Sequence, residues 1–201
     1  NRQIQQSTKI YDRTGETLLY DLNKDIQRTV IPYEDISRHI KNATIAIEDD
    51  TFFEHRGVRP LAIVRAALSN LREGDLLGGQ GGSTITQQVI KNALLVPDKT
   101  ITRKVKEAIL ALRLESELSK EEILAHYLNE SPYGGTIYGV EEASQKFFGK
   151  SATDVTLAEA AYLAALPKAP TYFSPYGSNR DELETRKNLA LARMLENGFI
   201  T

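Results

Sequence analysis

The chain has 201 residues, of which 41% are hydrophobic and 26% charged, with a formal net charge of −2 and no cysteine. This apolar content excludes a disordered chain, the small net charge gives no indication of nucleic acid as a partner, and the lack of cysteine excludes disulfides, thiolate metal sites and a cysteine nucleophile. Residues 1–9 are too polar for a signal peptide, and no apolar run approaches the roughly 18 residues of a membrane span. Because both ends stop abruptly, we expect an excised domain.

A short β-hairpin is predicted within residues 8–33. The segments 9–12 and 17–20 flank a glycine-containing turn at 13–16. After the hairpin the pattern is helical almost throughout. Apolar residues recur at helical spacing as far as Glu48, at Ile36, Ile40, Ala43 and Ile47.

Helices and glycine-rich breaks alternate in the middle of the chain. Pro60 opens a second predicted helix, which is ended by a loop at 74–82 with Leu76 and Leu77 at its tip. Ser83 is the predicted N-cap of a helix that reaches about residue 95, and Thr100 caps the next one. Helical spacing predicts that this next helix turns its apolar residues inward, namely Ile101, Val105, Ile109 and Leu112.

Two capping boxes mark helices in the second half of the chain. Ser119 with Glu122, and Thr156 with Glu159, have the required spacing. A glycine-rich loop is predicted at 131–139, and a last helix is predicted from about 180 to 197. These elements predict a mainly α fold with a small β element at its start.

Two adjacent carboxylates, Glu48 and Asp49, follow an apolar run. Desolvation by an apolar wall raises the pKa of a carboxyl group, and a general base that works near neutral pH needs such a shift. His55 follows closely and is expected to be a structural hydrogen-bonding residue rather than a catalyst. For this segment alone, the alternative is a helix that ends in solvated acids and a turn at Gly57.

A glycine-rich entry into a helix, at 81–92, offers a second set of polar groups. Free backbone N–H groups at a helix start bind anions. The same helix presents Gln87, Gln88 and Lys91, which suit a sugar or a phosphate. A well-capped surface helix is the alternative for this segment alone.

A basic cluster follows on the next predicted helix. Glu107 comes four residues after Arg103 and three after Lys104, so the three side chains share one turn. Lys91 and Lys99 extend the cluster, and a diphosphate is its simplest ligand. The alternative is a solvated helix face with internal ion pairs.

Taken together and in this order, these stretches resemble the glycosyltransferase domain (glycosyltransferase family 51) of class A penicillin-binding proteins and monofunctional transglycosylases. The family's patterns ED-x-x-F-x-x-H-x-G, G-x-S-T-x-T-Q-Q, R-K-x-x-E and K-x-x-I-L-x-x-Y-L-N begin here at Glu48, Gly81, Arg103 and Lys120. Four such motifs in order are highly specific. Asp50 departs from the family, in which this position is often basic.

The resemblance implies a lysozyme-like fold with two helical lobes. Residues 1–33 would be an N-terminal β-hairpin and linker region that leads from a missing membrane anchor, and 34–201 the glycosyltransferase domain, with a small membrane-associated jaw lobe at about 60–82. The implied location is the outer face of the cytoplasmic membrane in the bacterial cell envelope. An N-terminal transmembrane helix outside this chain would anchor the protein there.

The reaction implied by the resemblance is polymerisation of lipid II into glycan strands. The undecaprenyl-diphosphate-linked chain would be transferred, with inversion, to the GlcNAc 4-hydroxyl of lipid II. Glu48 would be the general base, Glu107 would lie near the donor diphosphate, and Asp49 would orient Glu48 or bind a divalent metal. The implied substrate-binding residues are Ser83, Thr84, Thr86, Gln87, Gln88, Lys91, Lys99, Arg103, Lys104, Lys106, Tyr127 and Asn129.

No tightly bound cofactor is implied, although Mg²⁺ or Mn²⁺ is expected to stimulate the reaction. The implied partners are lipid II, the lipid-linked glycan chain, the membrane surface, moenomycin-type inhibitors and other cell-wall synthesis proteins. Two alternative functions remain open. One is a muramidase-like peptidoglycan hydrolase, which would have no need of the basic cluster, and the other is a catalytically silent scaffold that binds lipid II.

Overall fold

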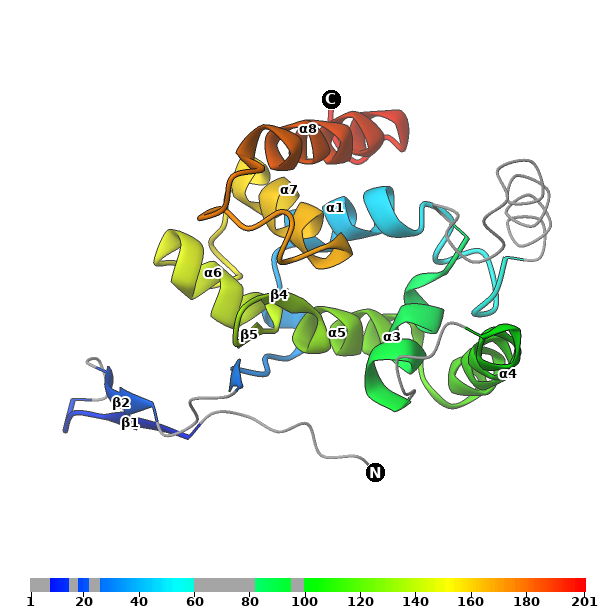
Figure 1. Cartoon of the computed structure of the whole chain (residues 1–201), viewed down its shortest axis with the longest axis horizontal. Coiled ribbons are helices and arrows are strands. Elements are labelled where there is room, and N and C mark those ends of the chain that lie inside the picture. The colour runs from blue at the N-terminus through cyan, green and yellow to red at the C-terminus, as the bar shows by residue number, and fades with distance from the viewer. Residues whose placement is uncertain (1–7, 15–17, 22–25, 60–81, 95–99) are drawn as a thin grey trace. The chain divides into compact units, whose positions relative to one another are not determined.

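The computed structural model describes residues 8–14, 18–21, 26–59, 82–94 and 100–201. Helices are its dominant element, which confirms the predicted mainly α class (Figure 1). The chain divides into two compact units, one made of residues 1–44 with 128–201 and the other of 45–127. The second predicted helix, the loop with Leu76 and Leu77, and nearly all of the predicted jaw lobe lie outside the described residues. No helix within the described ranges is long and apolar enough to cross a membrane.

Two small sheets belong to the first unit. Strand β1 (Lys9–Tyr11) pairs antiparallel with β2 (Leu18–Asp21), which confirms the predicted hairpin. The second sheet has the order β3–β5–β4, where β3 is Gln27–Arg28, β5 is Ile137–Tyr138 and β4 is Pro132–Gly134. Strands β4 and β5 are antiparallel, whereas β3 and β5 are parallel.

The prediction that residues 131–139 form a loop is therefore wrong, because this segment contains β4 and β5. Gly134 and Gly135 have φ angles of 114° and 55° and let the chain reverse between the two strands. Strands of two or three residues are too short to show the alternation of polar and apolar side chains by which a strand is recognised in a sequence.

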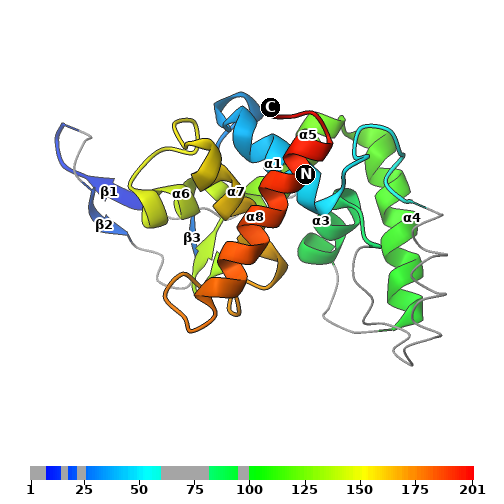
Figure 2. The same ribbon diagram turned by 90° about the horizontal axis from the view of Figure 1, so that it is seen from above.

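The helices α6 (Val140–Phe148), α7 (Leu157–Ala165) and α8 (Arg180–Glu196) complete the first unit, together with two short 3₁₀ helices, η1 (Tyr33–Asp35) and η2 (Leu166–Lys168). Helix α7 packs against both α6 and α8 (Figure 2). Leu163 on α7 and Leu183 and Met194 on α8 are fully buried, as expected for a helical core.

Helices α3 (Ile85–Leu94) and α4 (Ile101–Glu117) pack against each other in the second unit. The divisions of the chain between the units, after residues 44 and 127, fall within two helices. These are α1 (Arg38–Glu48) and α5 (Lys120–Glu130). The first helix ends at Glu48, as predicted, and Thr100 caps α4 by accepting a hydrogen bond from the backbone N–H of Arg103 at 3.2 Å.

The predicted orientation of α4 is wrong. Val105, Ile109 and Leu112 are 53%, 60% and 48% exposed, whereas Glu107 and Ala111 are almost completely buried. Helical spacing shows that apolar residues share a face, but it does not show which face meets the rest of the molecule. Here the buried face is the one that carries Glu107.

Candidate active site

Glu48 is the last residue of α1 and its side chain is half-buried. The side-chain amide of Gln88, on the first turn of α3, donates a hydrogen bond from Nε2 to Oε2 of Glu48 over 2.9 Å. The predicted base and a residue predicted to bind substrate are therefore in direct contact. A carboxylate that is held by a neutral donor and is still partly exposed is both oriented and accessible, as a general base requires.

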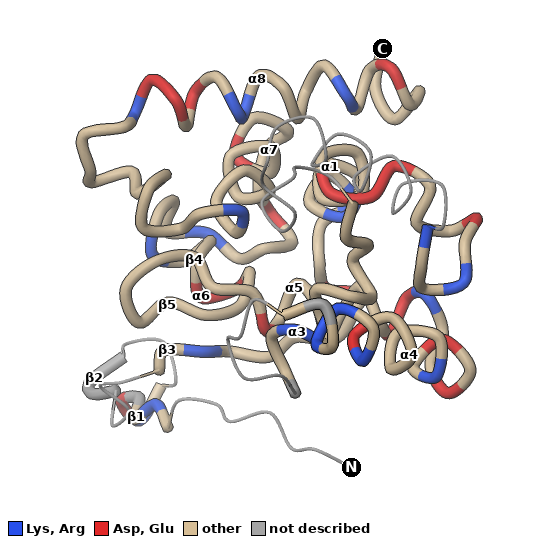
Figure 3. Tube along the Cα trace, turned by 45° about the vertical axis from the view of Figure 1, so that its right-hand side comes forward, with Lys and Arg blue, Asp and Glu red and all other residues tan. Residues whose placement is uncertain are grey.

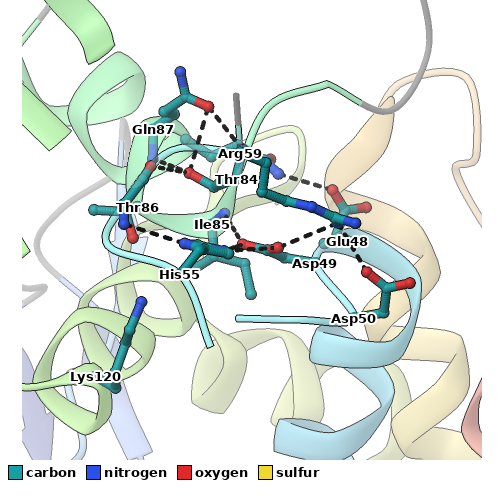
Figure 4. Close-up of polar contacts among 12 residues, drawn as sticks. Glu48, Asp49, Asp50, His55, Arg59, Thr84, Ile85, Thr86, Gln87 and Lys120 are labelled. Carbon is teal, nitrogen blue, oxygen red and sulfur yellow. Dashed lines mark hydrogen bonds and ion pairs between the residues drawn. The ribbon is translucent and has the colours of Figure 1, made fainter. Parts of the chain in front are cut away.

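Asp49 differs from its neighbour because its side chain is completely buried. The two carboxylate oxygens lie 3.0 and 2.9 Å from Nε2 of His55, and Oδ2 accepts the backbone N–H of Ile85 at 3.0 Å (Figure 4). The guanidinium of Arg59 is 3.6 Å from Oδ1. Asp49 therefore ties the end of α1 to the first residue of α3.

His55 is oriented by hydrogen bonds at both ring nitrogens. Nδ1 accepts the backbone N–H of Gly57 at 3.1 Å, so Nε2 carries the proton that is donated to Asp49. This geometry agrees with the hydrogen-bonding role that the sequence predicts for His55.

A divalent metal is a further predicted ligand of Asp49. Both oxygens are engaged by donors within the protein, and the cation of Arg59 lies close to one of them. The described part of the chain holds no group of three or more His, Cys, Asp or Glu side chains arranged to bind a metal ion. Metal binding by Asp49 therefore stays a prediction, since each carboxylate oxygen has two lone pairs and can accept more than one contact.

The residue that caps the start of α3 is Thr84. The sequence predicted Ser83 as this cap, and that prediction is wrong. The backbone N–H of Gln87 donates to Oγ1 of Thr84 at 3.1 Å, and the backbone N–H of Thr84 donates to Oε1 of Gln87 at 3.0 Å. This is a reciprocal capping box. The hydroxyl of Thr84 also donates to the carbonyl of Gly57 at 2.6 Å. Thr84 and Gln87 are buried and bind within the protein, so their contact with substrate stays a prediction.

Thr86 is also buried, and it takes part in a network that the sequence did not reveal. Its hydroxyl donates to Oε1 of Glu115 at 2.6 Å, and Nζ of Lys120 lies 2.7 Å from the same oxygen. The ammonium of Lys120 is also 4.5 Å from the centre of the Phe52 ring. Lys120 and Phe52 belong to the family motifs. Glu115 lies between two motifs, and no pattern in the sequence predicted that it takes part in this network. The network connects α3, α4, α5 and the turn that follows α1.

Lys104 links the start of α3 to the buried carboxylate of α4. Its ammonium donates to Oγ of Ser83 at 2.5 Å and forms an ion pair with Oε1 of Glu107. Glu107 is 1% exposed, and its Oε2 has no hydrogen-bond partner among the described residues. The Lys104 side chain is 42% exposed, so its positive charge remains accessible to an anion from solution. Basic and acidic residues both occur along α4 (Figure 3).

The other predicted binding residues are more scattered. Lys91 and Lys106 are exposed, Arg103 is half-buried, and Lys99 lies outside the described residues. Tyr127 is a core residue. Asn129 binds the backbone of Ile31 with both ends of its amide, at 3.1 and 2.9 Å, and it belongs to the first unit of the chain.

Known proteins resemble this chain over nearly its whole length. It is 45% identical to penicillin-binding protein 1A of Aquifex aeolicus and 43% identical to that of Escherichia coli, in both cases over 98% of this chain. A crystal structure of penicillin-binding protein 1A from Haemophilus influenzae covers all of the chain with a TM-score of 0.54 and 25% identity.

The chain spans about a quarter of the length of the curated relatives, 26% of the A. aeolicus protein and 23% of the E. coli protein. It corresponds to 20% of the H. influenzae chain. Residues 15–195 match the family model described as Transglycosylase. The match covers most of the sequence and contains both Glu48 and the Lys104–Glu107 pair, so the chain belongs to the transglycosylase family.

Proposed function

We propose that this chain is a peptidoglycan glycosyltransferase that polymerises lipid II. The observation that carries the proposal is a partly exposed carboxylate, Glu48, which Gln88 holds within a domain of the transglycosylase family. The substrates are a growing glycan chain on undecaprenyl diphosphate, as donor, and lipid II, as acceptor.

Glu48 is the general base in this proposal. It removes the proton from the GlcNAc 4-hydroxyl of lipid II while the hydroxyl oxygen forms a bond to the anomeric carbon of the donor's MurNAc. The bond between that carbon and the diphosphate oxygen breaks, and the undecaprenyl diphosphate leaves with the bonding electrons. Attack from the opposite side inverts the configuration from α to β. The polar, partly exposed position of Glu48 supports this role.

Lys104 stabilises the departing diphosphate in this proposal. Its ammonium is half-exposed, and the buried Glu107 and the hydroxyl of Ser83 keep it in position. A fixed cation at the place where negative charge develops stabilises the transition state without reorganisation. A muramidase would release no diphosphate and would make no use of such a cation. Arg103, Lys91 and Lys106 add positive charge on the same two helices.

The proposal extends to the location and partners of the protein. A lipid-linked substrate requires the protein to work at a membrane surface, so we place it on the outer face of the cytoplasmic membrane. Moenomycin-type phosphoglycolipids, which resemble the lipid-linked donor, would compete for the site that contains Lys104.

Conversion of labelled lipid II in detergent tests the proposal. The wild type should form polymer, and Glu48→Gln should reduce the rate at least about 100-fold, because an amide cannot accept the proton. Glu54→Gln is the matched control, because Glu54 is an exposed carboxylate in the turn that follows Glu48, and it should keep the wild-type rate.

The other outcomes separate the alternatives. Equal rates for the wild type and Glu48→Gln would remove Glu48 as the base. Release of sugars from polymeric peptidoglycan without a lipid diphosphate would indicate a hydrolase. Binding of lipid II without conversion, even with Mg²⁺ supplied, would indicate a scaffold.

A further inference from the structure

We propose that an aromatic surface in the first unit of the chain binds a β-1,4-linked glycan chain. It is formed by α6, α7 and the segment that leads into α8, and it includes none of the residues assigned to the reaction. The inference rests on the proposed function, which supplies the glycan, but its binding test does not depend on polymerisation. The aromatic surface consists of Phe147, Phe148, Tyr162, Tyr172, Phe173 and Tyr176.

Four of these rings form a continuous row. The ring centre of Phe148 lies 5.9 Å from that of Tyr162 and 6.5 Å from that of Phe147. The ring centre of Phe147 lies 6.2 Å from that of Tyr176. Neighbouring rings are inclined by 73°, 72° and 50°, within the edge-on and tilted arrangements that aromatic pairs prefer. The row ends at Tyr176, which is 74% exposed, so a ring that packs against the protein also remains open to solution.

The segment that carries the two most exposed rings is held by its own hydrogen bonds. The backbone N–H of Gly177 donates to the carbonyl of Ser174 at 3.0 Å, and the side-chain amide of Asn179 donates to the carbonyl of Tyr172 at 3.2 Å. The ring of Tyr172 is 5.1 Å from that of Phe173, and its side chain is exposed. Because the backbone beneath these rings is already ordered, a ligand that packs on them loses little binding energy to ordering the protein.

The exposed chemistry suits a sugar chain. Each pyranose unit of a β-1,4-linked glycan has C–H groups on its faces and hydroxyl or acetamido groups around its edge. An aromatic face packs against the C–H groups, and the phenol hydroxyl of a tyrosine both donates and accepts hydrogen bonds. Uncharged hydrogen-bonding side chains lie in the same segment as the two tyrosines, namely Thr171, Ser174, Ser178 and Asn179. A neutral sugar therefore finds both kinds of contact that it needs.

The row of rings also favours a repeating ligand. Phe147 and Phe148 are partly exposed between Tyr162 and Tyr176, so successive rings face solution at similar intervals. A polymer of sugar rings repeats in the same way. Membrane-binding surfaces combine aliphatic side chains with several cations, and the aromatic surface contains neither. In the proposed function the growing strand is held at the same protein, so its effective concentration is high and a weak site is sufficient to bind it.

Titration with chitohexaose, the β-1,4-linked hexamer of GlcNAc, tests the proposal. This probe carries no lipid, diphosphate or peptide. In the ¹⁵N–¹H spectrum, we expect a saturable shift of the Gly177 amide, which lies beside Tyr176. Tyr176→Ala should weaken the affinity at least about fivefold, because an exposed aromatic contact is removed. Tyr176→Phe should stay within about twofold of the wild type, because it keeps the ring.

Leu195→Ala is the matched control. Leu195 is a 58% exposed apolar side chain on α8 that does not belong to the aromatic surface, and its loss should leave the affinity unchanged. The free energy of unfolding should change little in both alanine variants, since both side chains are exposed. Equal affinity of the wild type and Tyr176→Ala, or shifts confined to the residues around Glu48, would overturn the proposal. Loss of vesicle binding in Tyr176→Ala, without a change in chitohexaose binding, would identify a membrane surface instead.

The length of the polymer separates this inference from the proposed function. If the wild type polymerises lipid II, the double variant Tyr172→Ala with Tyr176→Ala should make shorter strands while it consumes lipid II within about twofold of the wild-type rate, because a strand that is held less well leaves earlier. Strands of unchanged length would overturn the role of this surface in holding the product. If the wild type makes no polymer, the proposed function fails, and the chitohexaose titration still decides whether the surface binds a glycan.

Discussion

Glu48 and Asp49 are adjacent in the chain, but their carboxylates have different surroundings. Glu48 is half-buried and accepts a hydrogen bond from a neutral amide. Asp49 is buried, and donors from His55 and Ile85 occupy both of its oxygens. Two carboxylates in different environments can perform different tasks, one in chemistry and one in holding the site together.

Substitution of each acid by its amide should separate these tasks. In either orientation of the new amide, Asp49→Asn turns an NH₂ group toward the N–H of His55, because His55 faces both carboxylate oxygens. It also removes the buried negative charge that lies 3.6 Å from the guanidinium of Arg59. We expect the free energy of unfolding to fall by about 2–4 kcal/mol. Glu48→Gln retains an oxygen that can accept from Gln88, and its free energy of unfolding should change by less than about 0.5 kcal/mol. Urea unfolding of both variants measures the difference, and equal losses would contradict the assignment.

Position 57 requires glycine for two reasons, the backbone conformation and the close packing around it. Its φ angle is 83°, and a Cβ atom at this position would lie 2.8 Å from the carbonyl oxygen of Ala111 on α4. Gly57→Ala should therefore lower the free energy of unfolding by about 3 kcal/mol, from left-handed strain and a clash with the backbone. Gly149→Ala is the matched control, since Gly149 has a φ of 66° and a Cβ atom there would meet nothing within 4 Å. It should lose only about 1 kcal/mol, and equal losses would exclude the clash.

At the scale of elements, helix ends are fixed by short-range capping. The capping box predicted at Thr156 and Glu159 is present at the start of α7, with the N–H of Thr156 donating to Oε2 of Glu159 at 2.8 Å. Lys150 also donates to this carboxylate, at 2.8 and 3.1 Å. The hydrogen bond from Lys150, followed by that from Thr156, lowers the pKa of Glu159 below its ordinary value of 4.5. The predicted box at Ser119 and Glu122 is also present, at the start of α5.

The stabilisation by Glu159 should depend on pH. Its pKa is lower in the folded than in the unfolded state, so the unfolded chain binds the proton more tightly. The contribution is complete above the ordinary carboxyl value and is lost as the pH falls through the folded-state value. The difference in unfolding free energy between wild type and Glu159→Gln should therefore be largest above about pH 5 and should shrink on acidification. A difference that is constant down to about pH 3 would show that the carboxylate is not responsible.

At the scale of the whole molecule, α4 presents an apolar surface to its surroundings. Val105, Ile109 and Leu112 are exposed along one side of the helix, and the neighbouring Lys106 and Arg113 are exposed and basic. Apolar residues flanked by cations on one helix face are typical of surfaces that bind anionic lipids. Such a surface is consistent with the proposed function, in which the protein acts on a lipid-linked substrate.

Replacement of these three apolar residues by serine should weaken membrane binding. We expect co-sedimentation with vesicles that contain anionic lipid to fall about tenfold or more, because the apolar contact with the interface is lost. The free energy of unfolding should change little, since the side chains are already exposed. Leu189→Ser with Leu195→Ser is the matched control, because these exposed leucines lie on α8. Equal loss of binding in both sets would show that α4 is not the membrane-binding element.

Features that depend on neighbouring residues could be predicted from the order of amino acids alone. The hairpin of β1 and β2, the end of α1 at Glu48, and the caps at Thr100, Ser119 and Thr156 were all predicted and are present. Each depends on residues only a few positions apart, so the information lies within a short window of the chain. The ordered motifs identified the family for the same reason, since each motif is a local pattern.

Contacts between residues far apart in the chain became known only from the folded molecule. Gln88 lies 40 residues from Glu48, and Ile85 lies 36 residues from Asp49, so no local spacing could show that they are hydrogen-bonded. The cap of α3 moved from Ser83 to Thr84 because Thr84 is held by Gly57, 27 residues away. The buried face of α4 is likewise set by what packs against it, which the period of a helix does not contain. The chemistry of Glu48 therefore depends on partners that the fold brings together.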